Sequence, residues 1–335
     1  MQQLKIGDVI LDNRIIVGPM AGISNNSFRT VIREFGGALI YSEMISDKAI
    51  CFKNKKTLKM CVVNDEERPI ALQLFGHDID TMVQAAVYLD KETNCDIIDI
   101  NMGCPVSKVC KSKAGCALMQ MPEHAYKMVK AIVESVDKPV TVKLRAGWSH
   151  QHINVVEMAL LMEKAGVSAI AVHPRTRTDY YSGHSNWDLI KQVKEAVKVP
   201  VIGNGDVKTL QDYIEMRKQT NCDFVMVARG CLGNPWLIKQ LVEYEKVGKL
   251  VEEPTYKEKI DQCLYHAREL VKLKGERTGI KMMRGHACWY ISGLTHANKV
   301  KAKINKINKY EDLNNLMEKY IAALETEDYS YFEDN

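Results

Sequence analysis

Residues 199–229 read VPVIGNGDVKTLQDYIEMRKQTNCDFVMVAR, and this stretch indicates the fold most directly. Two short apolar runs, VPVIGN (199–204) and DFVMVAR (223–229), flank a segment with apolar residues at helical spacing. A helix between two buried strands is the repeating unit of a parallel sheet. Six similar runs precede this unit: RIIVGP (14–19), ALIYSE (38–43), IALQLF (70–75), IIDIN (97–101), PVTVKL (139–144) and AIAVHP (169–174). Eight such units close a (β/α)8 barrel, the TIM barrel, so we predict an α/β protein with this fold.

The chain beyond residue 235 has a different pattern. Segments of helical spacing follow one another without apolar strand runs, and Glu253-Pro254 interrupts them. We therefore predict a barrel over residues 1–240 and an all-helical domain over 250–335, with the boundary between 235 and 255. The opening LKIGDVILDNR has alternating apolar residues around turn formers and predicts a hairpin.

The composition is that of an ordinary globular protein. Of the 335 residues, 46% are hydrophobic and 26% are charged, which excludes disordered and collagen-like chains. The chain has neither an export signal nor an uninterrupted apolar stretch of membrane-spanning length, so we expect a cytoplasmic protein without a membrane partner. In that compartment its ten cysteines are expected to be reduced thiols.

Positive charge is concentrated in the predicted helical domain. Residues 255–310 hold thirteen basic and four acidic residues, a net charge of +9, whereas residues 311–335 hold one basic and eight acidic residues, a net charge of −7. The basic stretch includes Arg277, Lys281 and Arg284. Such a stretch is either a solvated helix face or a surface for a polyanion, and the charge alone leaves both open.

Polar residues stand where the predicted strands end. In a (β/α)8 barrel the carboxyl ends of the strands carry the chemistry. An amide, a thiol, an imidazole and cationic groups from successive strands indicate a cofactor with a heteroaromatic edge. The turns after the last two strands, GNGD and ARG, suit a phosphate, although turn formation alone also explains the first of them. The strand ends are Pro19-Met20-Ala21-Gly22, Glu43-Met44, Gln73, Asn101 to Pro105, Lys143-Leu144-Arg145, His173-Pro174-Arg175, Asn204-Gly205-Asp206 and Ala228-Arg229-Gly230.

Lys143 and Gln73 are polar residues within apolar runs. A buried ammonium needs a partner, and Lys143 either neutralises an anionic cofactor atom or forms an internal ion pair with Glu43 or Asp99. Gln73 offers both a donor and an acceptor to a ring edge, or it is a satisfied core amide. Arg229 similarly suits a phosphate or a helix carboxylate.

Cys104 is the strongest catalytic candidate. It lies on the turn Asn101-Met102-Gly103-Cys104-Pro105, at the predicted mouth of the barrel. A thiol is mostly protonated at neutral pH and can donate a proton or, when activated, attack as a nucleophile. Cys110 and Cys116 do not follow at the spacing of a zinc or iron–sulfur site, so we expect no metal.

These motifs resemble those of the tRNA-dihydrouridine synthases, a family of FMN-dependent enzymes, and are most similar to its bacterial B-type branch. The resemblance covers nearly the whole chain. The DINMGCP segment is the most specific motif, and the others occur in family order. The motifs are GPMAGISNNSFR (18–29), QLFG (73–76), DINMGCPVSKVCKSKAGCALM (99–119), VKLRAGW (142–148), VHPRTRTDYYSG (172–183), VIGNGD (201–206) and VMVARGCLGNPW (225–236).

The resemblance implies a role for each site residue. In such enzymes NADPH reduces FMN, the flavin delivers hydride to C6 of a tRNA uridine, and the cysteine, here Cys104, protonates C5. The implied cofactor residues are Pro19, Met20, Ala21, Gln73, Lys143, His173, Asn204, Gly205, Asp206, Ala228 and Arg229. The expected substrate contacts are Asn101, Arg145, Arg175, Arg177, Arg277, Lys281 and Arg284. Loop arginines that are merely solvated are the alternative for Arg145, Arg175 and Arg177.

The substrate implied by the resemblance is tRNA, and we expect the chain to act as a monomer. A uridine must leave its stack to reach the site, and the basic helical stretch would then hold the RNA backbone. Trp289-Tyr290 could stack on a base, but packing in the helical core is the favoured interpretation. Two other functions remain open, namely an FMN barrel acting on a free pyrimidine and an RNA-binding protein without catalysis.

Overall fold

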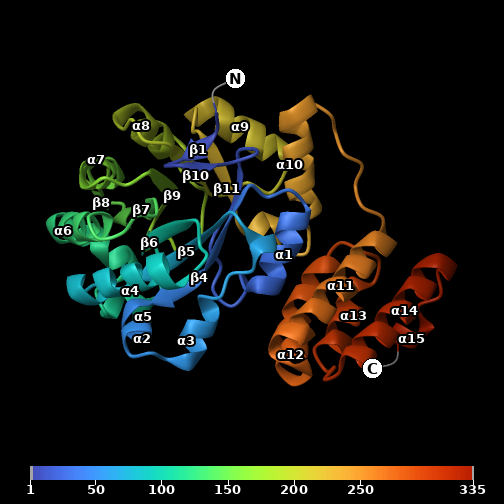
Figure 1. Cartoon of the computed structure of the whole chain (residues 1–335). Coiled ribbons are helices and arrows are strands. Elements are labelled where there is room, and N and C mark those ends of the chain that lie inside the picture. Colours follow the sequence, from blue (N-terminus) through green and yellow to red (C-terminus); the bar gives the residue numbers. More distant parts are fainter. Residues whose placement is uncertain (1–2, 334–335) are drawn as a thin grey trace.

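Eight parallel strands close a barrel in the computed structural model, which describes residues 3–333 (Figure 1). β3 pairs with both β4 and β11, and β6 pairs with both β5 and β7, so the sheet has no open edge. The barrel strands are β3 (Ile15–Val17), β4 (Leu39–Ser46), β5 (Ile70–Phe75), β6 (Ile97–Met102), β7 (Val140–Ser149), β9 (Ala169–Thr176), β10 (Val201–Asn204) and β11 (Phe224–Val227). Each contains residues of one predicted run, and the predicted (β/α)8 barrel is confirmed.

Helices surround the barrel, and three of those named below begin at a side-chain cap. Asp78 accepts from the amide of Thr81 at the start of one helix, and Thr209 accepts from the amide of Asp212 at another. Gly166, with φ of +97°, ends a third helix in the left-handed conformation. The surrounding helices are α1 (Asn26–Glu34), α4 (Ile79–Glu92), α6 (Pro122–Val133), α7 (Val155–Ala165), α8 (Asp188–Ala196), α9 (Leu210–Thr220) and α10 (Trp236–Val247).

Shorter elements lie in the connections. The predicted hairpin is present, with Ile6 facing Val9 across a two-residue turn. The shorter elements are β1 (Lys5–Ile6), β2 (Val9–Ile10), α2 (Asp47–Cys51), α3 (Lys55–Met60), η1 (Asp65–Glu67), α5 (Ser107–Lys111), η2 (Gly115–Gln120), β8 (His152–Ile153) and η3 (Arg229–Cys231).

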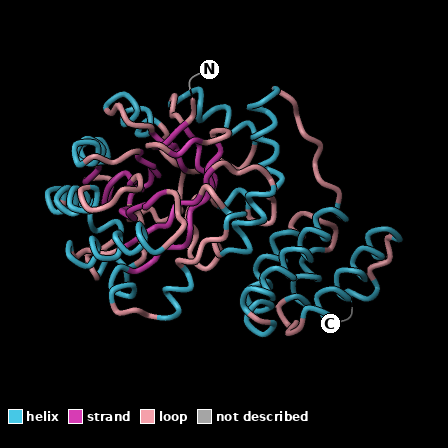
Figure 2. The backbone as a smooth tube through the Cα atoms, in the orientation of Figure 1, coloured by secondary structure: helices cyan, strands magenta, loops and turns pink. Residues whose placement is uncertain are grey.

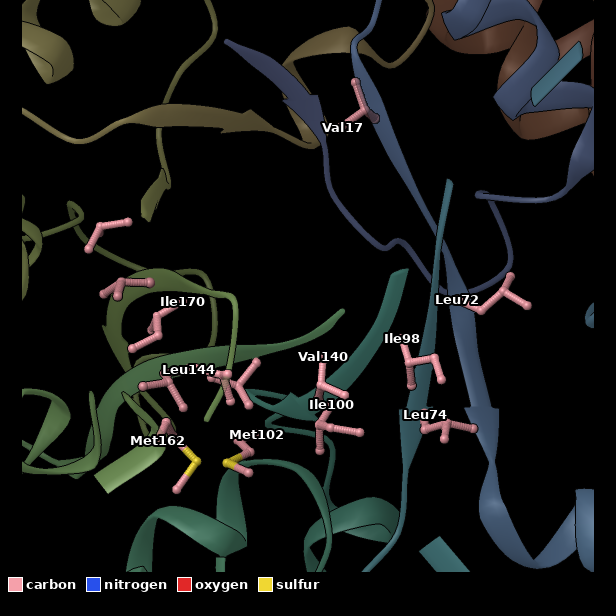
Figure 3. Packing of buried hydrophobic residues seen from close by; sticks show 14 of the residues in the cluster. Val17, Leu72, Leu74, Ile98, Ile100, Met102, Val140, Leu144, Met162 and Ile170 are labelled. Atoms are coloured by element: carbon pink, nitrogen blue, oxygen red, sulfur yellow. The ribbon is translucent and has the colours of Figure 1, made fainter. Parts of the chain in front are cut away.

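Side chains of each barrel strand alternate between two surroundings. On β6, Ile98, Ile100 and Met102 belong to the cluster that packs against the outer helices (Figure 3). The residues that alternate with them, Ile97, Asp99 and Asn101, point into the barrel, because successive side chains of a strand face opposite sides. At the amino-terminal end the interior is apolar and includes Ile6 and Leu11 of the hairpin segment. At the carboxyl end the interior is polar, which is where the site lies.

A separate bundle of helices follows the barrel (Figure 2). Its own buried cluster runs from Ile260 to Phe332, whereas the buried residues of α10, Leu237, Ile238, Leu241 and Val242, belong to the barrel cluster. Residues 249–255 connect the barrel and the bundle without helix or strand. The helices of the bundle are α11 (Tyr256–Lys274), α12 (Glu276–Tyr290), α13 (Ala297–Ile304), α14 (Tyr310–Thr326) and α15 (Ser330–Glu333). Within residues 3–333, no helix has both the length and the apolar character needed to cross a bilayer.

The bundle packs against α1 and against the loop after η3. Tyr265 of α11 donates to the carboxylate of Glu34 at 2.5 Å, and the rings of His266 and His286 lie 6.3 and 6.2 Å from that of Phe28. At Gly233 a Cβ would lie 2.3 Å from the carbonyl carbon of Trp289. α12 therefore lies against the loop that follows Arg229.

Candidate active site

A cavity of about 430 Å³ opens at the carboxyl end of the barrel. It collects side chains from all eight strands or the loops that follow them, so residues far apart in sequence share one wall. Every residue predicted to hold the cofactor lines it, together with Cys104, Asn101 and Arg145. Those cofactor residues are Pro19, Met20, Ala21, Gln73, Lys143, His173, Asn204, Gly205, Asp206, Ala228 and Arg229.

A chain of buried hydrogen bonds runs from the floor of the cavity to the turn that carries Cys104. Asp99 accepts from Gln73 Nε2 at 2.6 Å and from Thr141 Oγ1 at 2.6 Å. The amide of Gln73 is thereby oriented, and its Oε1 accepts from Asn101 Nδ2 at 2.7 Å. Asn101 Oδ1 in turn accepts from the backbone amides of Gly103 and Cys104, at 3.1 and 2.9 Å. Each amide group has only one orientation that satisfies this chain.

Cys104 lines the cavity, and the residue is 8% exposed. Burial raises its pKa above the ordinary value, and the backbone hydrogen bond at Val106 only partly opposes this. A thiol with a raised pKa keeps its proton at neutral pH. The environment therefore suits a proton donor and does not activate a nucleophilic thiolate.

Lys143 and Asp99 are charged groups of opposite sign on neighbouring strands. Burial lowers the pKa of Lys143 to about 8, with Arg145 adding to the shift and Asp99 opposing it. Burial raises the pKa of Asp99 to about 7, against the hydrogen bonds from Thr141 and Gln73 and the charge of Lys143. Among the described residues no carboxylate forms an ion pair with Lys143. Its ammonium group, at the cavity wall, is thus free for an anionic ligand.

His173 is a neutral imidazole with a defined tautomer. Burial, and after it the cations Lys143, Arg145, Arg175 and Arg229, lower its pKa well below the ordinary value. Arg175 Nη1 lies 3.2 Å from its Nε2, and because a guanidinium only donates, Nε2 must accept. The proton of His173 is therefore on Nδ1.

Arg175 was predicted to contact substrate, and in the structure its guanidinium is bound to protein groups. Its side chain is buried and forms an ion pair with Asp206 at 2.9 Å. Its Nη2, which binds Asp206, also donates to the carbonyl of Gly183, while Nε donates to the carbonyl of Ser182 and Nη1 to Ser185 Oγ. Arg175 therefore organises the loop beside His173 and has no free donor to offer a ligand.

One end of the cavity suits a phosphate. The turn after β10 contributes Gly205, with φ of +126°, and Asp206, with φ of +61°, and the turn after β11 contributes Ala228 and Arg229. At Gly205 a Cβ would lie 2.4 Å from Ser185 Oγ, so only glycine fits there. The exposed guanidinium of Arg229 lies over the ring of Tyr181 at 4.7 Å and retains donors for a ligand.

The other predicted substrate contacts have different positions. Arg145 lines the cavity, but its guanidinium donates to the carbonyls of Gly103, Thr176 and Tyr180. Arg177 lies over the rings of Trp148 and Tyr180 and is outside the cavity wall.

Among the basic residues of α12, Arg277 and Lys281 are exposed. Arg284 is half-buried and donates to the carbonyl of Ile307 and to Asn308 Oδ1, so its predicted substrate contact stays a prediction.

Two aromatic residues of the site were not predicted there. Tyr181 was not singled out, and Trp289 was expected in the helical core. Tyr181 lines the cavity with its ring between Arg145 and Arg229, and the only signal was an aromatic pair in a polar loop. Trp289 also lines the cavity, while Tyr290 is buried in the bundle. The helical domain therefore contributes to the cavity wall.

No group of three or more potential metal ligands occurs in the part of the chain that the structure describes. The thiols of Cys110 and Cys116 instead approach backbone carbonyls, those of Cys104 and Gly147.

Comparison with known proteins gives one family. The model of the dihydrouridine synthase (Dus) family matches residues 15–325. A probable tRNA-dihydrouridine synthase of Rickettsia bellii is 37% identical over 306 residues, covering 91% of this chain and 94% of its own. The tRNA-dihydrouridine synthase B of Shewanella oneidensis is 35% identical over 321 residues, covering 96% and 99%. That of Pasteurella multocida is 37% identical over 292 residues, covering 87% of each chain.

Solved structures with low sequence identity share the fold. Histamine dehydrogenase from Rhizobium superposes with a TM-score of 0.54 at 16% identity, over 72% of this chain and 48% of its own, so this chain spans about half of that one. An old yellow enzyme homologue from Zymomonas mobilis gives a TM-score of 0.51 at 12% identity, over 75% and 94%. The fold, the order of the motifs and the match over nearly the whole length lead to one conclusion: this chain belongs to the dihydrouridine synthase family.

Proposed function

We propose that this protein reduces the C5–C6 double bond of uridines in tRNA to dihydrouridine, with bound FMN as cofactor and NADPH as reductant. The observation that carries the proposal is the protonated thiol of Cys104 in a cavity shared with unpaired Lys143 and neutral His173. The relatives bear the name tRNA-dihydrouridine synthase, which supports the same reaction here.

The cavity fits a flavin. Its volume of about 430 Å³ lies within the range of about 300 to 1,000 Å³ typical of small-molecule sites. Lys143 supplies a cation, His173 an N–H at Nδ1, and Gln73 one amide hydrogen that the buried chain leaves free. These donors match a ring edge rich in carbonyl and imine atoms, and Arg229 with the glycine turns suits a terminal phosphate.

The chain's own residues provide the remaining chemistry. A bound flavin mononucleotide, once reduced by NADPH, supplies a hydride for C6 of the uridine. Cys104 donates its proton to C5, so the thiol becomes a thiolate and the base gains two hydrogens in total. Lys143 would stabilise negative charge on a bound flavin through its ammonium group, and His173 beside it is neutral.

The substrate must present a single unstacked base to this cavity. A uridine inside a helical stack cannot reach the thiol of a cysteine that is 8% exposed, so the nucleotide is expected to turn out of the stack. Exposed Arg277 and Lys281 of α12 lie on the domain that supplies Trp289 to the cavity, and they suit the RNA backbone. The proposal includes a monomeric working form, because one chain supplies every wall of the cavity, and action in the cytoplasm on tRNA.

The test is dihydrouridine formation on tRNA lacking the modification. Purified protein reconstituted with FMN is incubated with NADPH and with such a tRNA, and nucleosides are quantified by mass spectrometry. We expect FMN- and NADPH-dependent dihydrouridine, and no product from free uridine at equal concentration. Efficient reduction of the free nucleoside would point to a small-molecule enzyme, and protein that takes up no flavin would contradict an enzymatic role.

A further inference from the structure

Two segments at the cavity end of the barrel carry positive charge without negative charge. Residues 48–64 contain five lysines and no acidic residue, and residues 100–122 contain three lysines and no acidic residue. All eight side chains are exposed. We call this set the lysine rim: Lys48, Lys53, Lys55, Lys56, Lys59, Lys108, Lys111 and Lys113.

The topology brings both segments to the mouth of the cavity. α2 and α3 follow the carboxyl end of β4, and α5 follows that of β6, and all three helices lie at one end of the barrel (Figure 1). Met44 and Val106, which line the cavity, stand four and two residues before the first lysine of each segment.

One lysine of each segment lowers the pKa of the same histidine, and Asp78 opposes both. Burial and the neighbouring His124 lower the pKa of His77, and Lys113 and Lys48 both add to that shift. One lysine of each segment is therefore close enough to influence the same imidazole.

In the described part of the chain, the rim lysines lack the ion pairs that several lysines on the wall of the barrel form. Five wall lysines form ion pairs: Lys91 with Asp90 and Asp137, Lys130 with Glu134, Lys138 with Asp90, Lys191 with Glu195 and Lys194 with Asp223. Among the described residues, the rim lysines form none. Eight such exposed ammonium groups make this end of the barrel electropositive, and such a surface favours a polyanionic partner.

We propose that the lysine rim binds phosphates of the RNA backbone, so that the substrate is held by the barrel as well as by the helical domain. The inference rests on the proposed function, which brings RNA to this cavity. The other source of phosphate at the mouth is the nicotinamide dinucleotide, whose three phosphates cannot occupy eight lysines. A backbone strand with a phosphate at every nucleotide can follow the rim across both segments.

The test compares two triple variants with equal loss of charge. K53Q/K55Q/K56Q removes three rim lysines on or next to α3. The control, K5Q/K198Q/K218Q, removes three exposed lysines near the amino-terminal ends of the barrel strands. Holoenzyme affinity for unmodified tRNA is measured at a series of salt concentrations, together with the KM for tRNA and for NADPH.

We expect the rim variant to bind tRNA at least about tenfold more weakly at 0.1 M salt than the control variant. The slope of log affinity against log salt should fall by about 0.7 to 0.9 for each phosphate that the variant no longer neutralises. The kcat, the KM for NADPH and flavin reduction without tRNA should be unchanged. K108Q/K111Q/K113Q should weaken tRNA binding in the same way.

Three results would separate the possibilities. Equal tRNA affinity and salt slope in the rim and control variants would overturn the proposal. A raised KM for NADPH with unchanged tRNA affinity would also overturn it and assign the rim to the dinucleotide. If the wild-type protein forms no dihydrouridine, the proposed function fails. The tRNA titrations then decide by themselves whether the lysine rim binds RNA.

Discussion

Cys104 is the residue on which the proposed chemistry depends most directly. Cys104→Ala removes the proton donor and leaves the residues that suit a flavin in place. We expect the variant to bind FMN and oxidise NADPH at wild-type rates, while dihydrouridine formation falls by about 10²- to 10⁴-fold, the usual contribution of a general acid. Anaerobic single-turnover mixing of the reduced enzyme with tRNA measures this step. Cys288→Ala, a half-buried cysteine on α12, is the control, and wild-type yield from Cys104→Ala would remove the thiol from the mechanism.

Asp99 sets both the geometry and the charge beneath the cavity. In Asp99→Asn the new amide can still accept from Gln73 and donate to Thr141 Oγ1, so the hydrogen-bond chain to Cys104 remains. The negative charge that raises the pKa of Lys143 is lost, so that pKa should fall below about 8. We expect the alkaline loss of flavin reduction by NADPH to shift to lower pH.

Asp99→Leu tests the geometry separately. It leaves two buried donors unpaired, at a cost of about 1 to 3 kcal/mol each, and it frees the amide of Gln73 to rotate. Activity on tRNA should then fall more than in Asp99→Asn at every pH. Identical pH profiles in the wild-type protein and Asp99→Asn would show that Asp99 carries no charge that Lys143 senses.

At the scale of elements, Gly233 decides how α12 meets the barrel. Its φ is +65°, and a Cβ would lie 2.3 and 2.4 Å from backbone atoms of Trp289 and Tyr290. Backbone atoms cannot rotate away, so Gly233→Ala should displace α12 and the cavity wall at Trp289. Gly248 has a similar φ of +66° and open space around it. Gly248→Ala should therefore cost only the strain of the left-handed conformation, about 1 kcal/mol. Thermal unfolding and flavin retention should separate the two variants, and equal effects would refute the close approach.

The elements themselves were largely predictable, because each barrel strand is a short apolar run between turn formers. The helical domain was also visible as the loss of that alternation. What the sequence could not supply was the length of strands beyond their apolar runs. β9 continues through Arg175 to Thr176, which places that guanidinium among protein acceptors instead of in the cavity.

Contacts between distant elements were the other feature that the sequence did not predict. Trp289 and Tyr290 are adjacent on one helix, and only the packing of α12 against the loop at Gly233 turns one toward the cavity and the other into the bundle. Periodicity describes the apolar face of a helix but not which domain that face meets. The common position of Cys104, Lys143 and Gln73 at one cavity was predictable, because the strand ends of a barrel converge by geometry alone.

At the scale of the whole molecule, two buried histidines couple domain packing to pH. His266 and His286 face each other at 4.6 Å between ring centres, next to Phe28 of α1, Trp289 and Tyr290. Burial lowers the pKa of His286 to about 4, and burial together with His286 lowers that of His266 well below the ordinary value. Both rings are therefore neutral in the folded protein at neutral pH.

The sign of the pH effect follows from proton binding. Between about pH 6.5 and 4 the unfolded chain protonates these histidines while the folded protein does not, so acid favours unfolding. For His286 the difference of about 2.5 pKa units corresponds to about 3 kcal/mol of unfolding free energy lost by pH 4. His286→Phe keeps a ring against Phe28 and Trp289 but cannot titrate. Urea unfolding followed from pH 7 to pH 4 should therefore show a shallower loss of stability in His286→Phe than in the wild-type protein. Parallel pH dependences in the two proteins would show that His286 binds its proton equally well in the folded and the unfolded state.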